Sequence, residues 1–456
     1  DGDPNRVAVT GGSYGGIESW LQASQATWTF PHSLDPTLPV LSLQVAVPKY
    51  PSTDLAYGLA PNGRGGGPHL DDLYESSQGR PNDDQGDGNP IGVPKESYVT
   101  GLFAVGTTKG EWEVGGSQDI FPCTYGDCEG PVNIPAWKAR TDAGDPTSPE
   151  DPLMRQIRRG LTEFRSAYYQ DEGWARQLNG RKVAVFSIQG WTDDLFTAVE
   201  SFRMFKYLKR LDPRWPVELA LGDVGHSRAQ NKPATWRRLN ARAFDWLQSH
   251  IRGSREQRPV GWSEETVCGE GSPSTASGPT PEGLAGGALV LRYPAGATAS
   301  PLGVADPNGP ATDAIAGPLV QPGEECRRSD GPALGGYTGY SEPLKSTRTY
   351  VGIGHVRVPY VWAGAVSGQL NARLFDVAPD GTELLVTRGT YRLENDPAAG
   401  VLRLPLYGNH WRIERGHRLR LDLTQVDTPT CRPSNLASAI QFPEGVTLVL
   451  PTRERG

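Results

Sequence analysis

The feature that most restricts how this chain folds is a glycine-packed turn at residues 11–16, which reads GGSYGG. The apolar residues 7–9 before it predict a short strand, and residues 17–25 after it are compatible with a helix. A strand that passes into a helix through so few residues needs backbone conformations and close contacts that a Cβ atom forbids and glycine permits. The turn therefore predicts a β–α unit with Ser13 at its apex.

Three kinds of functional site use a glycine-rich turn between a strand and a helix. A phosphate-binding loop requires a lysine after the last glycine, but Ile17 follows Gly16. A dinucleotide-binding turn requires glycine at its third position, which Ser13 occupies when counting starts at Gly11. Residues 11–15 fit the third pattern, G-x-S-x-G, which presents a nucleophilic serine. A plain βα turn without chemistry is the alternative.

The nucleophilic interpretation gives each neighbour of the serine a physical purpose. A strained turn holds the serine Oγ clear of the sheet, and the positive end of the following helix favours negative charge. The backbone N–H of the next residue then donates to the oxyanion of a tetrahedral intermediate. We predict that Ser13 is a nucleophile and that the N–H of Tyr14 forms one half of an oxyanion hole.

A serine nucleophile needs a base and an acid that orients the base. In one large class of such sites the order along the chain is serine, acid, histidine. His226 follows an expected strand at 217–221, and Asp193 and Asp194 follow one at 183–188. The carboxyl ends of parallel strands meet at one edge of a sheet, so these groups are expected to lie close together. A pair of aspartates at a turn is also a common helix cap, which stays the alternative here.

The other histidines of the expected α/β region fit the role of base less well. His32 and His69 precede any later strand that carries an acid, and His250 lies near the end of an expected helix, on its exposed face. We therefore predict His226 as the base.

Hydrophobic periodicity divides the chain into two α/β pieces that flank an insertion, followed by an all-β region. Within the insertion, Asp151 and Pro152 predict a helix start, and the apolar spacing continues that helix to Tyr168. No convincing helical period interrupts residues 285–456, where short alternating strands predict a β-sandwich or jelly roll. The predicted domains are the nucleophile half of a core at 1–58, a cap insertion at 59–175, the acid and histidine half of the core at 176–255, and a jelly-roll β-sandwich at 256–456.

Charge and hydropathy limit the partners of this 456-residue chain. The net charge is −7 and no dense block of lysine and arginine occurs, so a nucleic acid or an anionic membrane has no electrostatic support. No apolar run approaches the length of a membrane span. We predict neither partner.

The five cysteines predict disulfides rather than a metal site. Cys123 and Cys128 flank a short turn and lack a second pair at zinc spacing, so a small loop disulfide is expected, with two free thiols as the alternative. Cys268 is expected to pair with Cys326, and an odd total leaves one thiol single unless its partner lies outside this sequence. Disulfides at these positions favour an exported, extracellular protein.

Three motifs together resemble a known family. The GGSYGG turn, GWTD at 190–193 and GDVGH at 222–226 are similar to those of cocaine esterase, α-amino-acid ester hydrolases and X-prolyl dipeptidyl-peptidases. The acid motif of that family commonly reads G-W-x-D, which selects Asp193 over Asp194. Its histidine motif commonly reads G-P-W-x-H, and here Asp223 and Val224 replace proline and tryptophan. Asp194 is then expected to face solvent or to cap the helix that begins near Leu195.

The resemblance implies an α/β-hydrolase core with an inserted helical cap and a C-terminal jelly roll. The stretch LNARLFDVAPDGTELLVTRGTYR is similar to the jelly-roll signature of the family. The implied activity is that of a serine hydrolase, either X-prolyl dipeptidyl-peptidase-like or acting on small esters. Its partner would be a small-molecule ester or a short peptide, with neither cofactor nor metal.

Two features of this interpretation leave alternatives open. A peptidase that reads a free amino terminus needs carboxylates near the nucleophile, and Asp71, Asp72 and Glu75 in the cap are candidates. A non-catalytic binding protein is the alternative from another class, with Trp362 and Trp411 of the jelly roll stacking on a sugar ring.

The position of the turn so early in the chain gives a further expectation. In this family several strands and a second oxyanion donor precede the nucleophile, whereas only twelve residues precede Ser13. We expect the N-terminal part of the core to lie outside this sequence, which is then a fragment or one of two chains. The strand around residues 6–10 is accordingly expected to have one unpaired side.

Overall fold

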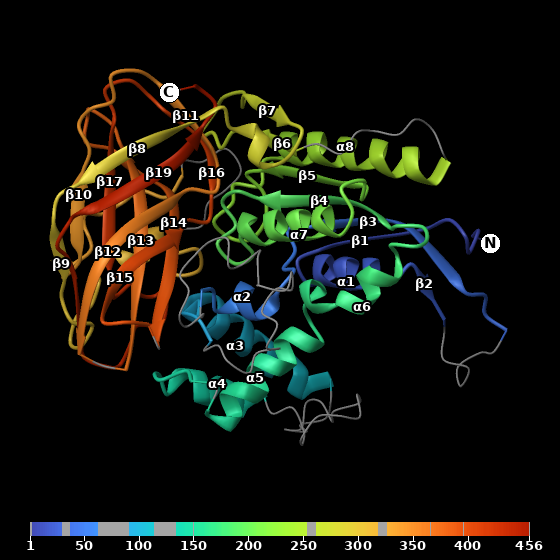
Figure 1. Ribbon diagram of the computed structural model, residues 1–456, viewed down its shortest axis with the longest axis horizontal. Coiled ribbons are helices and arrows are strands. Elements are labelled where there is room, and N and C mark those ends of the chain that lie inside the picture. The colour runs from blue at the N-terminus through green and yellow to red at the C-terminus, as the bar shows by residue number, and fades with distance from the viewer. Residues whose placement is uncertain are drawn as a thin grey trace.

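The strands in the described part of the chain form one mostly parallel sheet and two antiparallel sheets (Figure 1). A computed structural model describes residues 2–29, 37–62, 91–113, 134–148, 150–252, 261–317, 326–364, 366–394 and 396–455. In Figure 1 the antiparallel sheets lie together at one end of the molecule, and the parallel sheet with its helices lies beside them. This arrangement is the predicted combination of an α/β unit with a C-terminal β-sandwich.

The first sheet has the strand order β1-β3-β4-β5-β6-β7, and β2 pairs with β3. Pairing is parallel from β1 through β6 and antiparallel for β7 and β2. The strands are β1 (Val7–Gly12), β2 (Thr27–Trp28), β3 (Leu41–Lys49), β4 (Ala184–Gly190), β5 (Val217–Gly222), β6 (Gly261–Glu264) and β7 (Thr275–Gly278). Among the described strands β1 pairs with β3 alone, so the expected unpaired side of this strand is confirmed.

Helices cover both faces of this sheet. On one face the helices α1 (Tyr14–Ala23) and α7 (Ala198–Leu211) pack aromatic side chains such as Trp20 and Phe202 against Val185 and Leu219. On the other face α8 (Pro233–Arg252) packs Trp246 against the alternate residues of the same strands. Strands that are apolar on both faces are the expected consequence of burial between two helical layers.

The segment between β3 and β4 supplies a further group of helices, which lie below the sheet in Figure 1. They are α2 (Leu55–Leu59), α3 (Glu96–Glu113), α4 (Ile134–Asp142), α5 (Pro152–Glu163), the 3-10 turn η2 (Ala167–Tyr169) and α6 (Asp171–Arg176). The carboxylate of Asp151 accepts the N–H groups of Leu153 and Met154, which confirms the predicted start of α5. That helix ends at Glu163 rather than at Tyr168, which lies in η2 and is buried.

The C-terminal region is a sandwich of two antiparallel sheets, of order β10-β17-β13-β14 and β16-β11-β19-β12-β18-β9. In the second sheet β15 also pairs with β12, and β8 with β19. The strands are β8 (Gly287–Tyr293), β9 (Gly296–Thr298), β10 (Tyr337–Tyr340), β11 (Arg348–Gly352), β12 (His355–Gly364), β13 (Ser367–Val377), β14 (Glu383–Glu394), β15 (Ala399–Pro405), β16 (Asn409–Ile413), β17 (Arg418–Thr424), β18 (Ser438–Phe442) and β19 (Val446–Thr452). The short η3 (Glu282–Leu284) and α9 (Gly309–Thr312) complete the elements described here.

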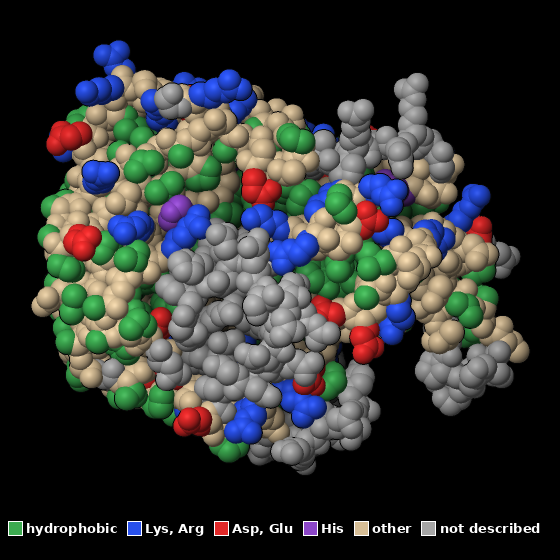
Figure 2. Space-filling view, viewed as in Figure 1, with side chains coloured by type: hydrophobic (Ala, Val, Ile, Leu, Met, Phe, Trp, Pro, Cys, Tyr) green, Lys and Arg blue, Asp and Glu red, His purple; other side chains and the backbone are tan. Residues whose placement is uncertain are grey.

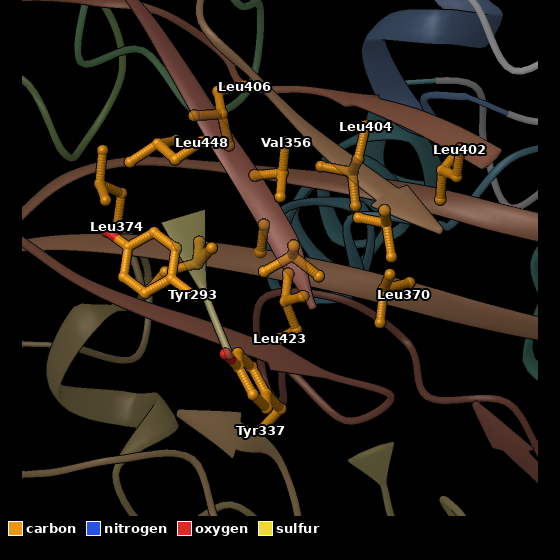
Figure 3. Close-up of a cluster of buried hydrophobic side chains, with 14 of the residues drawn as sticks. Tyr293, Tyr337, Val356, Leu370, Leu374, Leu402, Leu404, Leu406, Leu423 and Leu448 are labelled. Carbon is orange, nitrogen blue, oxygen red and sulfur yellow. The ribbon is translucent and has the colours of Figure 1, made fainter. Parts of the chain in front are cut away.

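Alternating apolar residues of the two sheets meet between them. Leu370, Leu374, Val356 and Leu404 are among the side chains that interdigitate in this core (Figure 3). Trp362 and Trp411 belong to the same buried cluster, so neither ring is available to stack on a sugar. The alternative of a sugar-binding face built on these two residues thereby loses its support.

The change from the first sheet to the sandwich falls later than the predicted domain limit at 255. Strands β6 and β7 extend the first sheet, and the first sandwich strand, β8, begins at Gly287. The short strand β6, which follows α8, pairs in parallel with β5 and therefore belongs to the first sheet. The other limits of the predicted domains stay predictions.

The surface shown in Figure 2 carries basic and acidic side chains interspersed over the described residues. Within the described ranges no helix is both long enough and apolar enough to cross a lipid bilayer.

Candidate active site

The predicted nucleophile lies between the first strand and the first helix of the chain. Ser13 follows β1 directly and has a φ of 54°, a left-handed conformation that is strained for a residue other than glycine. Its backbone N–H donates to the carbonyl of Lys49 at 3.1 Å, and its carbonyl accepts the N–H groups of Gly16 and Ile17. The turn is thus fixed to β3 on one side and to α1 on the other.

Steric contact explains the first glycine of the turn. A Cβ atom on Gly11 would lie 2.5 Å from the carbonyl carbon and oxygen of Gly15, closer than any Cβ atom approaches a backbone atom. Gly15, in contrast, has open space where a Cβ would stand. The crossing of β1 and α1 therefore requires glycine at position 11 but not at position 15.

The three residues predicted as nucleophile, base and acid form one continuous hydrogen-bonded chain. Oγ of Ser13 lies 2.7 Å from Nε2 of His226, and Nδ1 of His226 lies 2.8 Å from Oδ2 of Asp193. Asp193 is fully buried, and the His226 side chain keeps 17% of its surface exposed. Within this hydrogen-bonded series the Ser13 end is therefore accessible to solvent, whereas the Asp193 carboxylate is not.

Each partner of the serine sits after a parallel strand, as the sequence indicated. Asp193 follows β4, His226 follows β5, and the two strands are neighbours in the sheet. Gly225 has a φ of 123°, and a Cβ atom there would lie 2.3 Å from Oδ2 of Asp193. A glycine before the histidine is therefore what lets the carboxylate approach the histidine loop.

Asp193 also fixes its own turn. Its Oδ1 accepts the backbone N–H groups of Leu195 and Phe196, each at 3.0 Å. The carbonyl of Leu195 in turn accepts a hydrogen bond of 2.6 Å from Nζ of Lys95, a residue just before α3. Burial lowers the pKa of Lys95 to about 8. The turn after Asp193 is thus held from the cap segment as well.

The expectation for Asp194 is wrong. This side chain neither faces solvent nor caps a helix, because Asp193 accepts the N–H groups of the turn and α7 begins only at Ala198. Asp194 is buried, and its oxygens lie 3.5 Å from Nε of Arg228 and 3.3 Å from Nε of Arg388. A buried carboxylate is retained only with opposite charges beside it, and two arginines supply them.

Asp223, one of the two departures from the family motif, bridges the acid and histidine loops. Its carboxylate accepts the hydroxyl of Thr192 and two N–H groups of Gln230, at 3.1 Å from the backbone and 2.7 Å from the side chain. Burial raises the pKa of Asp223. The proline usual at this position has no side-chain acceptor, and no pattern in the sequence indicated this role.

Aromatic rings surround the histidine. The rings of Tyr50 and Phe196 have their centroids 5.2 Å from that of His226, and the ring of Tyr98 lies at 6.4 Å, all edge to face. Tyr50 follows β3 directly and has a φ of 36°, a second strained residue beside the site. Its place after a parallel strand is a signal that the sequence offered, whereas nothing in the sequence marked Tyr98.

Tyr14 opens α1, and its side chain is exposed beside the turn. Its backbone N–H therefore lies at the positive end of the helix, where the predicted oxyanion role places it. Within the described ranges no group of three or more histidine, cysteine or carboxylate side chains has the geometry of a metal site.

The other residues that the sequence analysis singled out lie away from Ser13, His226 and Asp193 or outside the described residues. Cys268 and Cys326 form the predicted disulfide, and Cys431 is a buried free thiol. His250 is half-buried in α8, and its ring centroid lies 4.2 Å from that of Trp246 in a tilted arrangement. The following predicted residues lie outside the described ranges: His32, His69, Asp71, Asp72, Glu75, Cys123 and Cys128.

Comparisons with known proteins place this fold among hydrolases with a C-terminal β domain. No known protein-family profile matches the chain, and curated protein sequences give no significant match. An aminopeptidase from a marine sediment Thaumarchaeota archaeon matches in structure with a TM-score of 0.54 at 15% identity, over 98% of this chain and 77% of that one. An α-amino acid ester hydrolase matches with a TM-score of 0.55 at 14% identity, over 98% and 77% of the two chains.

A CocE/NonD family hydrolase from Staphylococcus aureus matches similarly, with a TM-score of 0.55 at 11% identity over 98% of this chain and 72% of that one. At these identities the likeness establishes the fold. The fold implied by the sequence motifs is therefore confirmed: an α/β-hydrolase sheet followed by a β-sandwich.

Proposed function

We propose that the protein is a serine hydrolase that cleaves an ester or amide bond through an acyl-enzyme on Ser13. The observation that supports this most directly is the hydrogen-bonded chain from Ser13 through His226 to Asp193, with 2.7 Å and 2.8 Å between successive heavy atoms. These distances are those of a nucleophile and base poised for proton transfer. The fold neighbours, named as an aminopeptidase and an α-amino acid ester hydrolase, support the same reaction class.

The geometry supports the following roles in this reaction. Asp193 accepts the Nδ1–H of His226, which leaves the lone pair of Nε2 directed at the Ser13 hydroxyl. As Oγ attacks the substrate carbonyl, Nε2 takes the serine proton and then delivers it to the leaving alcohol or amine. Water, deprotonated by the same nitrogen, next attacks the acyl-enzyme and releases the acid and free Ser13. The N–H of Tyr14 donates to the oxyanion in both steps.

Covalent labelling with a fluorophosphonate probe tests this function, because only an activated serine reacts. We expect stoichiometric labelling of Ser13 by peptide mapping, and none in Ser13→Ala. Ser19→Ala is a matched control, since Ser19 lies in helix α1, which directly follows Ser13, and its hydroxyl donates to the carbonyl of Gly15. A chain that folds but leaves Ser13 unlabelled would contradict the proposal.

The finer activity is either that of an X-prolyl dipeptidyl-peptidase or that of a hydrolase of small esters. A dipeptide-proline anilide with a free amino terminus and a simple aryl ester separate the two. Cleavage of the anilide at a higher kcat/KM than its N-acetylated form would support the peptidase, because an X-prolyl dipeptidyl-peptidase recognises the free amino terminus of its substrate. Cleavage of the ester alone would support the esterase.

A further inference from the structure

The residue after the proposed acid lies in a charged cluster between the two parts of the molecule. The carboxylate of Asp194 is buried between Arg228, which belongs to the histidine loop, and Arg388, which belongs to strand β14 of the sandwich. Asp193 and Asp194 are adjacent, so their shared peptide fixes one relative to the other. One carboxylate contacts His226, and the next contacts the sandwich.

Arg228 also joins the acid turn, the histidine loop and strand β14. Its Nε donates to the carbonyl of Thr192 at 3.1 Å, and its Nη2 donates to the carbonyl of Val386 at 3.4 Å. Val386 lies on β14, two residues from Arg388. The acid turn at 192–194 is therefore held against the histidine loop and against β14 by two guanidinium groups.

The sandwich holds Arg388 firmly on its own side. Its Nη1 lies 3.5 Å from Oδ2 of Asp427, and its Nη2 donates to the carbonyl of Thr312 at 2.6 Å. Burial opposes the charged form of Arg388, but the carboxylates of Asp427 and Asp194 outweigh burial and raise its pKa. The guanidinium is thus a fixed cation to which Asp194 is attracted.

We propose that Asp194 and Arg388 are positioning residues, through which the β-sandwich sets the place of Asp193 relative to His226. This inference rests on the proposed serine-hydrolase function. A carboxylate that orients a histidine acts only at hydrogen-bond distance, and a displacement of about 1 Å can cost about 10²-fold in rate. Anchoring the neighbouring residue to a rigid sheet prevents such a displacement.

Arg392 offers a matched control on the same strand. It is a fully buried arginine of β14 that pairs with Asp145 and donates to the carbonyl of Gly92 at 3.1 Å. No contact joins it to residues 192–194 among its described partners. Arg392→Met therefore removes a comparable buried charge without touching the acid turn.

The experiment compares Arg388→Met and Asp194→Asn with Arg392→Met and the unmodified full chain. Thermal melting reports folding, and the second-order rate of fluorophosphonate labelling reports the state of Ser13. The downfield proton resonance of a histidine Nδ1–H bonded to a carboxylate reports the contact between His226 and Asp193. Asp194→Asn is the milder change, because it keeps the shape of the side chain and the pair of Arg388 with Asp427.

We expect labelling about 10²-fold slower in Arg388→Met and in Asp194→Asn, with the resonance lost or broadened. Arg392→Met should keep both the labelling rate and the resonance despite a lower melting temperature. If folded Asp194→Asn is labelled as fast as the unmodified chain and keeps the resonance, the inference is wrong. A failure of Asp194→Asn to fold would also overturn it, because the cluster would then serve the structure alone.

Failure of the proposed function has a different signature. If Ser13 of the unmodified chain does not react, the hydrolase proposal fails. The resonance still decides whether Arg388 and Asp194 place Asp193 against His226.

Discussion

Oδ2 of Asp193 lies 2.8 Å from Nδ1 of His226, while Oδ1 of the same carboxylate accepts two backbone N–H groups of its own turn. The carboxylate is thus held by its turn and is not free to rotate away from the histidine. Charge-assisted hydrogen bonds of this kind are stronger than neutral ones, and burial strengthens them further. These contacts make Asp193 a better candidate than Asp194 for the acid that orients His226.

Replacing Asp193 should damage turnover far more than replacing its neighbour. Asp193→Asn puts an amide opposite Nδ1, which favours the wrong tautomer of His226, and the expected loss is about 10⁴-fold in kcat. Asp194→Asn should cost about 10²-fold, since it disturbs placement only. Ester hydrolysis or probe labelling of the two variants decides. A larger loss from Asp194→Asn would show that the acid is misassigned.

Two glycines of the turn should respond oppositely to the same substitution. Gly11→Ala forces a Cβ to within 2.5 Å of backbone atoms of Gly15, so we expect a loss of about 3 kcal/mol or more in the free energy of unfolding. Gly15→Ala has open space inside α1 and should stabilise by up to about 1 kcal/mol. Urea denaturation midpoints measure both, and equal effects would contradict the packing of β1 against α1.

Stability should fall in mild acid because of His410. Burial lowers the pKa of this histidine to about 3, from an ordinary value near 6.5. Between these values the unfolded chain binds the proton and the folded chain does not, so stability is lost as pH falls below about 6.5. The loss between pH 7 and pH 5 is about 2 kcal/mol from this group.

His410→Asn tests this assignment, since it cannot take up the proton. Nδ1 of His410 lies 2.9 Å from the hydroxyl of Ser263, which in turn accepts the indole N–H of Trp191 at 2.9 Å. The variant is expected to be less stable at pH 7 but to show a flatter dependence of unfolding free energy between pH 7 and 5. An unchanged slope would place the acid sensitivity elsewhere.

The disulfide between Cys268 and Cys326 should stabilise the fold appreciably. The two cysteines are 58 residues apart, and closing a loop of that length removes about 4 kcal/mol of conformational entropy from the unfolded chain. Cys268→Ser with Cys326→Ser should lower the melting temperature, and a reducing agent should then have no further effect through this pair. Equal melting temperatures for the oxidised protein and the double variant would contradict this prediction.

Local sterics and periodicity made much of the site predictable from the sequence. The turn at Ser13 is specified within six residues, because the crossing of strand and helix leaves no room for a Cβ at Gly11. Parallel strands are marked by apolar runs, and their carboxyl ends meet at one edge, so the approach of His226 to the aspartate pair 193–194 followed from position, and the G-W-x-D motif selected Asp193. The start of α5 at Asp151 was equally local, since an N-cap needs only its next turn.

The tertiary structure decided what depends on partners distant in sequence. The sequence predicted Asp194 as a surface or capping residue. Its burial depends on Arg388, which lies on strand β14 of the sandwich, far from Asp194 in the sequence. In the sequence, Asp223 was only a departure from the family motif. In the structure it joins the acid loop to the histidine loop by accepting hydrogen bonds from Thr192 and Gln230. A buried charge is stable only where its counter-charges converge, and that convergence is a property of packing, not of the neighbouring sequence.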